Sequence, residues 1–471
     1  MDGPAFRRHG YRLVDWIADY LDHSDRYPVL SRVQPGDIRA SLPSTAPDEP
    51  EDFEAVLTDF ERILVPGLTH WNHPGFFGYF AITGSPPGVL AEFLCAALNQ
   101  QAMLWRTSPA ATELEEVSLG WLRQLIGLPD SFEGVIYDTA SMSTMHALIA
   151  ARQAAVSGSR LTGLAGQQSI PQLCVYCSAE AHSSVDKGMI AIGLGLDSLR
   201  RIPVDDEFRL RVDRLEQAIA ADRAAGRQPI AVVATIGTTS TTSVDPVQPI
   251  AEICERERMW LHVDAAYAGA AAMLPSHAQL FDGIARADSL VLNPHKWLFA
   301  PVDLSAFYCR RMDIVRDAFS LTPEYLKTTE AGRVKNLMDT GVQLGRRFRA
   351  LKLWMILRTY GVEGLRSHLN RHVALARAFA GWVDAHPEFE RLAPVPFSVV
   401  CFRWRPVHKD ADLDALNEKL LSELNETGEV FLSHTRINGC YALRLAVGHI
   451  RTEETHVRRA WNLILDRTSR L

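Results

Sequence analysis

The sequence contains no apolar stretch that approaches the roughly 20 residues needed to span a bilayer, and no tract in which lysine and arginine cluster. Its formal charge of −7 comes from 49 basic and 56 acidic residues, and the two signs are interspersed. The first residues, MDGPAFRRHGYRL, lack the apolar core of a secretory signal. These absences argue against a membrane protein and against a nucleic-acid-binding surface. We therefore expect neither a membrane nor a nucleic-acid partner.

Cysteine is scarce, with seven residues in a chain of 471. An odd number scattered over a long chain does not form a disulfide framework and fits a reducing cytoplasm. The one close pair, Cys174 and Cys177 in QLCVYCS, lies inside an apolar strand pattern. No second pair stands at the spacing of metal ligands. We expect buried thiols, no metal site and a cytoplasmic location.

Internal repeats and low-complexity segments are absent as well, and 47% hydrophobic composition over this length suffices for two or three domains. Residues 6–21 predict an amphipathic helix with one apolar stripe, formed by Phe6, Leu13, Ile17 and Leu21. The proline-rich stretch 28–50 predicts an extended connector. Since such a helix has little chain nearby to cover its stripe, we expect it to dock on a second subunit.

From about residue 134, short apolar runs such as GVIY, IAVVATIG, WLHVD and SLVLN alternate with helical patterns. This alternation predicts a mostly parallel sheet covered by helices on both faces. Beyond about residue 361 it lapses, and Asn438-Gly439 predicts a hairpin between two further strands. The predicted class is α/β, with an N-terminal helical and extended dimerisation segment at 1–80, a large domain at 81–360 and a small α+β domain at 361–471.

Polar residues follow several of the predicted strands, at the edge where open α/β sheets bind ligands. The turn DTAS, at 138–141, enters a helix and suits a phosphate, although Thr and Ser are also ordinary N-caps. His182 and Thr239 follow two other strands, and a lone histidine there is more often a cap or a core residue. Asp264 ends a buried strand, where a carboxylate needs a cation or a strong donor. Lys296 follows the next strand, 32 residues after Asp264.

Together these residues match the needs of one cofactor, pyridoxal 5'-phosphate. A lysine amine forms a Schiff base with its aldehyde, and a carboxylate keeps the pyridine nitrogen protonated. A helix N-terminus holds the phosphate. The residues alone therefore predict that Lys296 carries the cofactor.

Longer motifs carry a family resemblance. SPAATELE at 108–115, AHSSVDK at 181–187, LHVDAAYAG at 261–269 and NPHKW at 293–297 resemble the group II amino-acid decarboxylases, most closely the aromatic-L-amino-acid decarboxylases. The resemblance extends over nearly the whole chain, including LGRRFRALKLW at 344–354. It implies the fold of type I pyridoxal-phosphate enzymes and a homodimer whose active sites lie at the subunit interface. It also implies decarboxylation of an aromatic L-amino acid to an amine and CO₂.

The resemblance assigns roles to particular residues. Lys296 is the Schiff-base lysine, Asp264 pairs with the pyridine nitrogen and His182 stacks on the ring. The other implied cofactor contacts are Ala266 on the opposite ring face, Thr239 beside it, and Thr139, Ala140, Ser141, Asn293 and His295 around the phosphate. The implied substrate pocket comprises Trp71, Tyr79, Phe80 and Ile82, with Met103 and Leu104 from the partner subunit. Tyr325 matches a catalytic-loop tyrosine, and it or His182 would return a proton to Cα.

Two departures from the family's pattern affect the substrate. Ala81-Ile82 stand where many members have proline followed by a hydroxyl residue, and Leu104 and Arg106 replace small residues beside Trp105. Arg106 either faces the substrate or pairs with Glu113 or Glu116 at the surface. These departures leave the catalytic assignment intact and put the substrate in doubt, so a decarboxylase of a non-aromatic amino acid stays open. A second alternative in the same fold is an aromatic aldehyde synthase. The presence of His182 and Tyr325 favours the decarboxylase over the synthase, because the synthases of this family have lost one or the other.

Overall fold

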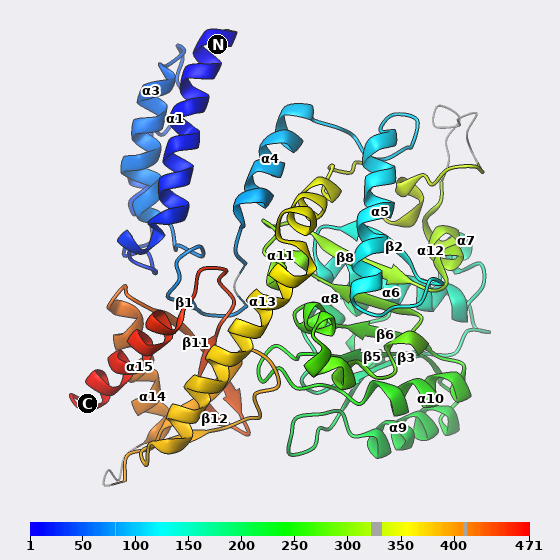
Figure 1. Ribbon diagram of the computed structural model, residues 1–471. Coiled ribbons are helices and arrows are strands. Elements are labelled where there is room, and N and C mark those ends of the chain that lie inside the picture. The colour runs from blue at the N-terminus through cyan, green and yellow to red at the C-terminus, as the bar shows by residue number, and fades with distance from the viewer. Residues whose placement is uncertain (81, 322–331, 408–411) are drawn as a thin grey trace. The chain divides into compact units, whose positions relative to one another are not determined.

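The computed structural model describes residues 1–80, 82–321, 332–407 and 412–471. The chain forms two compact units (Figure 1). One comprises Met1–Ala81, Leu375–Leu392 and Val400–Leu471, and the other comprises Ile82–Ala374 and Ala393–Val399. The N-terminal and C-terminal segments thus share a unit, while the division into three domains stays a prediction. No helix among the described residues is both long and apolar enough to cross a membrane.

The larger unit is built on a sheet in the order β2-β8-β7-β6-β5-β3-β4. Its described strands are β2 (Glu133–Tyr137), β3 (Leu173–Ser178), β4 (Leu199–Ile202), β5 (Gln228–Thr235), β6 (Trp260–Asp264), β7 (Ser289–Leu292) and β8 (Ser305–Cys309). Only β8 runs against its neighbours, and the other strands are parallel to one another. β3, β6 and β7 are buried along their whole length, which explains their continuous apolar sequences. The predicted mostly parallel sheet is confirmed.

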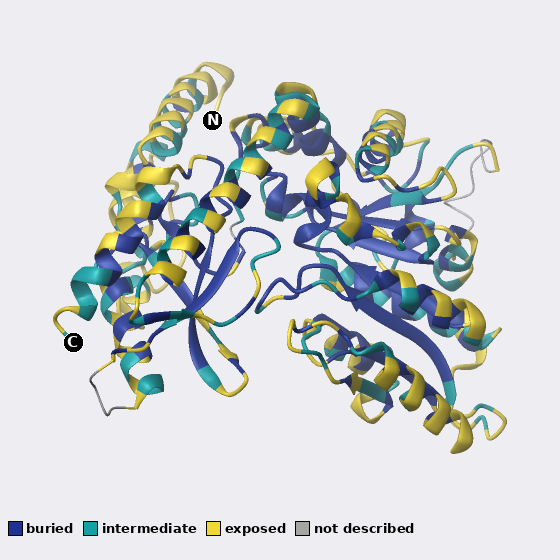
Figure 2. Cartoon of the chain, turned by 60° about the horizontal axis from the view of Figure 1, so that its bottom comes forward, coloured by how far each residue is buried: buried dark blue, intermediate teal, exposed yellow. Residues whose placement is uncertain are grey.

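Strand β3 shows that helices cover both faces of this sheet. Val175 and Cys177 pack with side chains of α6 (Ala140–Ala155) in one buried apolar cluster. Tyr176, between them, points to the opposite face, where its hydroxyl donates to Asp222 Oδ2 of α9 (Val212–Ala224) at 2.7 Å. The sheet between these helices is almost entirely buried (Figure 2). Also packed around it are α5 (Pro109–Leu125), α8 (Ser184–Ala191), α10 (Val247–Glu257) and α12 (Met312–Phe319).

The smaller unit begins with α1 (Gly3–Asp22), whose N-cap Asp2 accepts a hydrogen bond from Ala5 N at 2.8 Å. The predicted helix is therefore confirmed. Within the same unit Leu13 and Ile17 of the stripe are half-buried, and beside the stripe the ring of Trp16 lies 5.2 Å from that of Phe60, just after α3 (Phe53–Asp59). Phe6 nevertheless remains 70% exposed. The connector at 28–50 is not extended throughout, because it contains the short helix α2 (Asp37–Ser41).

The smaller unit also contains a sheet in the order β1-β11-β12-β10-β9. Its described strands are β1 (Phe76–Phe77), β9 (Phe389–Arg391), β10 (Val399–Trp404), β11 (Phe431–Ile437) and β12 (Cys440–Ala446), flanked by α14 (Leu413–Glu426) and α15 (Glu454–Thr468). β11 and β12 pair antiparallel around Asn438 and Gly439, whose φ angles are 49° and 84°. Positive φ at both central positions is what a type I′ turn requires, so the predicted hairpin is confirmed.

Three further elements matter for the site. α4 (Pro86–Leu98) precedes α5, and α11 (Pro294–Trp297) is the single turn that follows β7. α13 (Ala350–Ala385) is two helical segments joined at Gly361, where the backbone leaves the helical region with φ 63°. The first of these segments lies within the larger unit and carries the buried side chain of Lys352.

Candidate cofactor site

The structure brings Asp264 and Lys296 to the same edge of the sheet. Asp264 is the last residue of β6, which runs parallel to β7, and its register partner is Val291. Beyond the strands, Asn293 N donates to Ala266 O at 3.0 Å and Lys296 N donates to Asn293 O at 2.9 Å. These backbone bonds fix the turn that carries Lys296 against the end of β6. Lys296 itself is half-buried.

Asp264 is a buried carboxylate, only 5% exposed. Its Oδ1 accepts the amide of Ala266 at 3.0 Å, and no hydrogen bond to Oδ2 is found among the described residues. Burying a carboxylate is costly unless it meets a donor or a cation. The second oxygen is therefore suited to a protonated ring nitrogen of a ligand. Ala266, 8% exposed, lies beside it.

His182 follows β3 and is exposed at the same edge. Its Nδ1 accepts the amide of Ser184 at 3.1 Å, so the neutral ring carries its proton on Nε2. Desolvation lowers the pKa of His182, Asp264 raises it and Lys296 lowers it further. The three side chains are therefore within electrostatic reach of one another. A neutral imidazole at pH 7 offers a flat face to a stacked ring.

The turn after β2 forms an anion cradle. Thr139 is the N-cap of α6, and the amides of Ala140 and Ser141 begin the helix without an acceptor among the described residues. A helix N-terminus with such amides binds phosphate well. The neighbouring Asp138 carboxylate is engaged, because Oδ1 accepts Thr139 N at 2.6 Å and Oδ2 accepts Gln343 Nε2 at 3.0 Å.

Asn293 and His295 flank the turn of Lys296 and are 4% exposed each. The amide oxygen Oδ1 of Asn293 is buried and has no hydrogen-bond partner in the described structure. A buried polar atom without a partner is rare in folded proteins and indicates a missing donor. Burial lowers the pKa of His295 to about 3, and its Nδ1 accepts Leu304 N at 2.9 Å. His295 is therefore a neutral positioning group in this turn.

Thr239 lies exposed in the turn after β5. The neighbouring Thr238 is buried and holds this turn together, because its Oγ1 bonds Thr241 Oγ1 at 3.1 Å and accepts Ser243 N at 3.0 Å. The backbone bond from Ile236 N to Asp264 O, 2.9 Å long, joins the turn to the end of β6. The structure thus presents Thr239 at the same edge as Asp264.

The residues expected around the substrate are divided between the two units. Trp71, Tyr79 and Phe80 belong to the smaller unit, where the Trp71 and Tyr79 rings stack at 5.7 Å. Phe80 is 8% exposed, and the guanidinium of Arg444 lies 4.6 Å from its ring centre. Trp71 precedes β1 and Tyr79 and Phe80 follow it, so the three aromatic residues flank this strand. Their role toward a substrate stays a prediction.

In the larger unit, Ile82 is half-buried. Met103 and Leu104 pack on Met338, whose amide donates to Met103 O at 3.1 Å. Tyr325 lies outside the described residues.

The surface alternative for Arg106 named Glu113 and Glu116 as its partners. Glu113 Oε1 accepts the indole N–H of Trp105 at 2.7 Å. Glu116 pairs with Lys335 at 3.4 Å. Since a carboxylate can accept more than one donor, both alternatives for Arg106 stay open.

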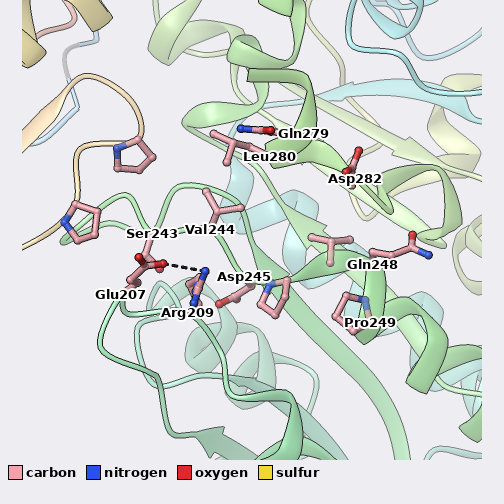
Figure 3. Close-up of a pocket in the computed structure, with 14 residues that line it drawn as sticks. Glu207, Arg209, Ser243, Val244, Asp245, Gln248, Pro249, Gln279, Leu280 and Asp282 are labelled. Atoms are coloured by element: carbon pink, nitrogen blue, oxygen red, sulfur yellow. Dashed lines mark ion pairs between the residues drawn. The ribbon is translucent and has the colours of Figure 1, made fainter. Parts of the chain in front are cut away.

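A cavity of about 290 Å³ lies elsewhere in the larger unit (Figure 3). Its walls include Arg209, Asp245, Leu280 and Pro396, and none of the predicted site residues that the structure describes lines it. Asp245 is buried there with Oδ1 on Leu210 N and Oδ2 on Thr235 N, both at 2.8 Å. The cavity is distinct from the edge that carries Lys296.

Sequence reasoning missed the buried charges behind the site. Lys352 and Arg349 are 1% and 8% exposed, and both interact with the loop that follows Lys296. The segment LGRRFRALKLW drew attention only as part of a family resemblance. It carries four cationic residues, Arg346, Arg347, Arg349 and Lys352, and all of them except Arg347 are buried.

The donors and acceptors at this edge fit pyridoxal phosphate: an amine on a buried turn, a carboxylate with a free oxygen, an imidazole face and a helix N-terminus for an anion. Fold and site therefore define a pyridoxal-phosphate enzyme. Residues 35–405 match the model of the pyridoxal-dependent decarboxylase conserved domain. The chain belongs to this family, and its cofactor is pyridoxal phosphate. The resemblance read from the sequence is confirmed.

Individual relatives agree with this assignment. A tryptophan decarboxylase from Camptotheca acuminata is 42% identical over 98% of this chain and 94% of its own. The phenylacetaldehyde synthase from Arabidopsis thaliana is 39% identical over 100% of this chain and 97% of its own. The crystal structure of Oryza sativa TDC with PLP and tryptamine has a TM-score of 0.95 at 37% identity, covering 100% of this chain and 99% of that one. The predicted fold class is confirmed.

Proposed function

We propose that this protein decarboxylates an aromatic L-amino acid to the corresponding amine and CO₂, with Lys296, Asp264 and His182 as its catalytic side chains. The observation that carries the proposal is the pairing of a half-buried lysine with a buried carboxylate at the ends of adjacent parallel strands. The names of the relatives, a tryptophan decarboxylase among them, support an aromatic substrate. The stacked Trp71 and Tyr79 rings are consistent with one.

Bound pyridoxal phosphate supplies an aldehyde that bonds amines and a pyridine ring that accepts the electron pair left when CO₂ departs. Lys296 would hold it covalently and release it to the substrate amine. Asp264 would keep a proton on the ring nitrogen, which makes the ring a strong electron acceptor. His182 would cover one ring face and Ala266 the other. The amides of Ala140 and Ser141, with Asn293 and His295, would bind the phosphate.

Proton delivery to Cα decides what is released. Tyr325, with His182 as the alternative donor, would supply that proton and yield the amine. His182 lies within electrostatic reach of Lys296, which supports its candidacy as the alternative donor. This step separates a decarboxylase from an oxidative enzyme.

The proposal is tested by product analysis. Purified protein loaded with cofactor is given phenylalanine, tyrosine, dihydroxyphenylalanine, tryptophan, 5-hydroxytryptophan and glutamate in turn, and CO₂, amine, ammonia and peroxide are measured. We expect CO₂ and amine in equal amounts from at least one aromatic substrate. Borohydride reduction should fix the cofactor to the peptide that contains Lys296, and Lys296→Ala should abolish this label. Release of CO₂ from glutamate alone would contradict the aromatic assignment.

The second candidate is an aromatic aldehyde synthase, because a phenylacetaldehyde synthase is 39% identical over the whole chain. Such an enzyme couples loss of CO₂ to oxygen uptake and releases aldehyde, ammonia and peroxide. The same assay discriminates the two candidates. Aldehyde and peroxide in amounts equal to CO₂ would replace the decarboxylase proposal with this one.

We further propose a homodimer that works in the cytoplasm. On α4, the side chains of Leu90, Leu94 and Leu98 are 52%, 46% and 53% exposed and lie four residues apart. This spacing places them on one helix face, and contiguous exposed apolar surface marks an interaction site. Leu94→Glu should yield monomers in sedimentation velocity, whereas Lys419→Glu, on an exposed helix face, should not. A dimeric Leu94→Glu variant would contradict this surface. The seven described cysteines are all unpaired, as expected in a reducing compartment.

A further inference from the structure

Lys352 is a buried cation in the larger unit, on α13. Its side chain is 1% exposed, and its Nζ donates to Pro301 O at 3.0 Å and to Asp303 O at 2.9 Å. The same nitrogen lies 2.6 Å from Glu92 Oε1, on α4. An ammonium group has three N–H donors. The three acceptors therefore use its whole hydrogen-bonding capacity.

The two carbonyls belong to one loop, residues 298–304, which joins α11 to β8. At the end of this loop, Leu304 N donates to His295 Nδ1 at 2.9 Å, and His295 N donates to Leu304 O at 3.4 Å. His295 directly precedes Lys296. Hydrogen bonds and the backbone of the loop therefore connect the ammonium group of Lys352 to the turn that carries Lys296.

The neighbouring charges have other partners. The second oxygen of Glu92 accepts Arg347 Nη2 at 2.6 Å. The carboxylate of Asp303 accepts Nε and Nη2 of Arg349, both at 3.1 Å. Glu92 and Asp303 therefore each have an arginine as counter-ion in addition to any contribution from Lys352. The feature specific to Lys352 is the pair of loop carbonyls, which neither arginine contacts in the described hydrogen bonds.

Burying an ammonium is costly, and a buried ion pair often adds little net stability compared with apolar packing. A fully buried lysine that donates two of its three N–H groups to backbone carbonyls restricts the position of that backbone. We propose that Lys352 is a positioning residue. It fixes the loop 298–304 and thereby holds the His295–Lys296 turn in the geometry that bonds the cofactor. The inference rests on the proposed role of Lys296.

The test compares two variants of the full-length protein without cofactor. Lys352→Met keeps the length and apolar stem of the side chain and deletes all three donors. Glu92→Gln removes the ion pair and leaves both carbonyl bonds. Backbone amide exchange of the peptide spanning 298–305 is followed by mass spectrometry, and cofactor affinity is measured by absorbance titration. We expect at least tenfold faster exchange and at least tenfold weaker binding for Lys352→Met, and changes below about threefold for Glu92→Gln.

Equal effects of the two variants would overturn the proposal, because Lys352 would then act only as the counter-ion of Glu92. Unchanged exchange in Lys352→Met would overturn it as well. Should that variant not fold, Lys352→Arg keeps the charge but cannot place its longer, planar head where Nζ lies. It should melt near the wild-type temperature and still bind cofactor at least tenfold more weakly, and wild-type affinity would count against the proposal. A wild-type protein that forms no bond to cofactor at Lys296 would refute the proposed function instead.

Discussion

The buried ion pair between Glu115 and Arg346 offers a quantitative test of how the site is supported. The two side chains are 3% and 5% exposed and lie 2.8 Å apart. Glu115 Oε1 also accepts Ile136 N at 2.8 Å, and Arg346 donates to Ile136 O at 2.7 Å and to Ala102 O at 3.3 Å. The pair therefore ties the end of β2, which leads into the anion cradle, to the segment that carries Met103.

Replacing Arg346 by methionine removes the cation and leaves the Glu115 carboxylate buried with only one amide donor. Breaking a buried pair in this way typically costs about 3–5 kcal/mol. We expect Arg346→Met to lower the free energy of unfolding by that amount. Glu115→Met combined with Arg346→Met should recover part of the loss, because no uncompensated charge then remains buried.

The measurement is urea unfolding followed by tryptophan fluorescence at a fixed saturating cofactor concentration, since ligand binding itself adds to stability. The control is the exposed pair Arg256–Glu216, with side chains 56% and 48% exposed. Arg256→Met should cost less than about 1 kcal/mol. The reasoning is refuted if Arg346→Met costs no more than Arg256→Met, or if the double variant is less stable than Arg346→Met alone.

Three other predictions concern single groups. Asp264→Asn should keep most bound cofactor yet lower the rate of CO₂ release by about 10²–10³-fold, because an amide cannot hold the ring proton; near-normal turnover would remove Asp264 from the mechanism. Tyr325→Phe should still release CO₂ but produce aldehyde and peroxide in place of most amine, since losing a general acid slows its step by about 10²–10⁴-fold; amine at the wild-type rate would exclude Tyr325 as the donor. Burial raises the pKa of Asp245 to about 7, so its contribution to stability is lost as pH rises from about 4 toward 7. The stability advantage of wild type over Asp245→Asn in urea should therefore shrink between pH 5 and pH 8, and an advantage that grows with pH would contradict the assignment.

The sequence predicted the sheet well, and it also predicted that Asp264 and Lys296 lie at the same edge, because both features depend on local patterns. β6 and β7 are buried along their whole length, and such strands appear in a sequence as continuous apolar runs. The polar residue that ends such a run is conspicuous, as Asp264 is. Since parallel strands end at one edge, Asp264 and Lys296 had to lie near each other. The Asn438-Gly439 hairpin was equally local, because its turn chemistry is specific to two residues.

The contacts that support the site could not be predicted from such patterns. Arg346 and Glu115 are 231 residues apart in the sequence. The local sequence around either residue does not identify the other as its partner. Charged residues are also read as solvent-exposed by default, so the burial of Lys352 was not foreseen. The apolar stripe of α1 was expected to dock on a second subunit, yet within this chain Leu13 and Ile17 are already half-buried while Phe6 is exposed. In each case contacts between distant parts of the chain determine which side chains are buried, and such contacts leave no periodic pattern in the sequence.

The buried charges of the larger unit share a pattern that stability alone does not explain. Glu115–Arg346, Glu92–Lys352 and Asp303–Arg349 all join residues 346–352 to segments that flank the cofactor edge. Each buried ion carries a desolvation penalty of several kcal/mol that a matched apolar core would avoid. Apolar contacts, however, tolerate small sliding movements, whereas charged hydrogen bonds fix both distance and direction. An electron-accepting cofactor needs its lysine and carboxylate held to within a fraction of an ångström. We therefore expect the stretch 346–352 to hold in place the loops that lead from β2 and from Lys296, and this positional role would account for charges that are buried at a cost.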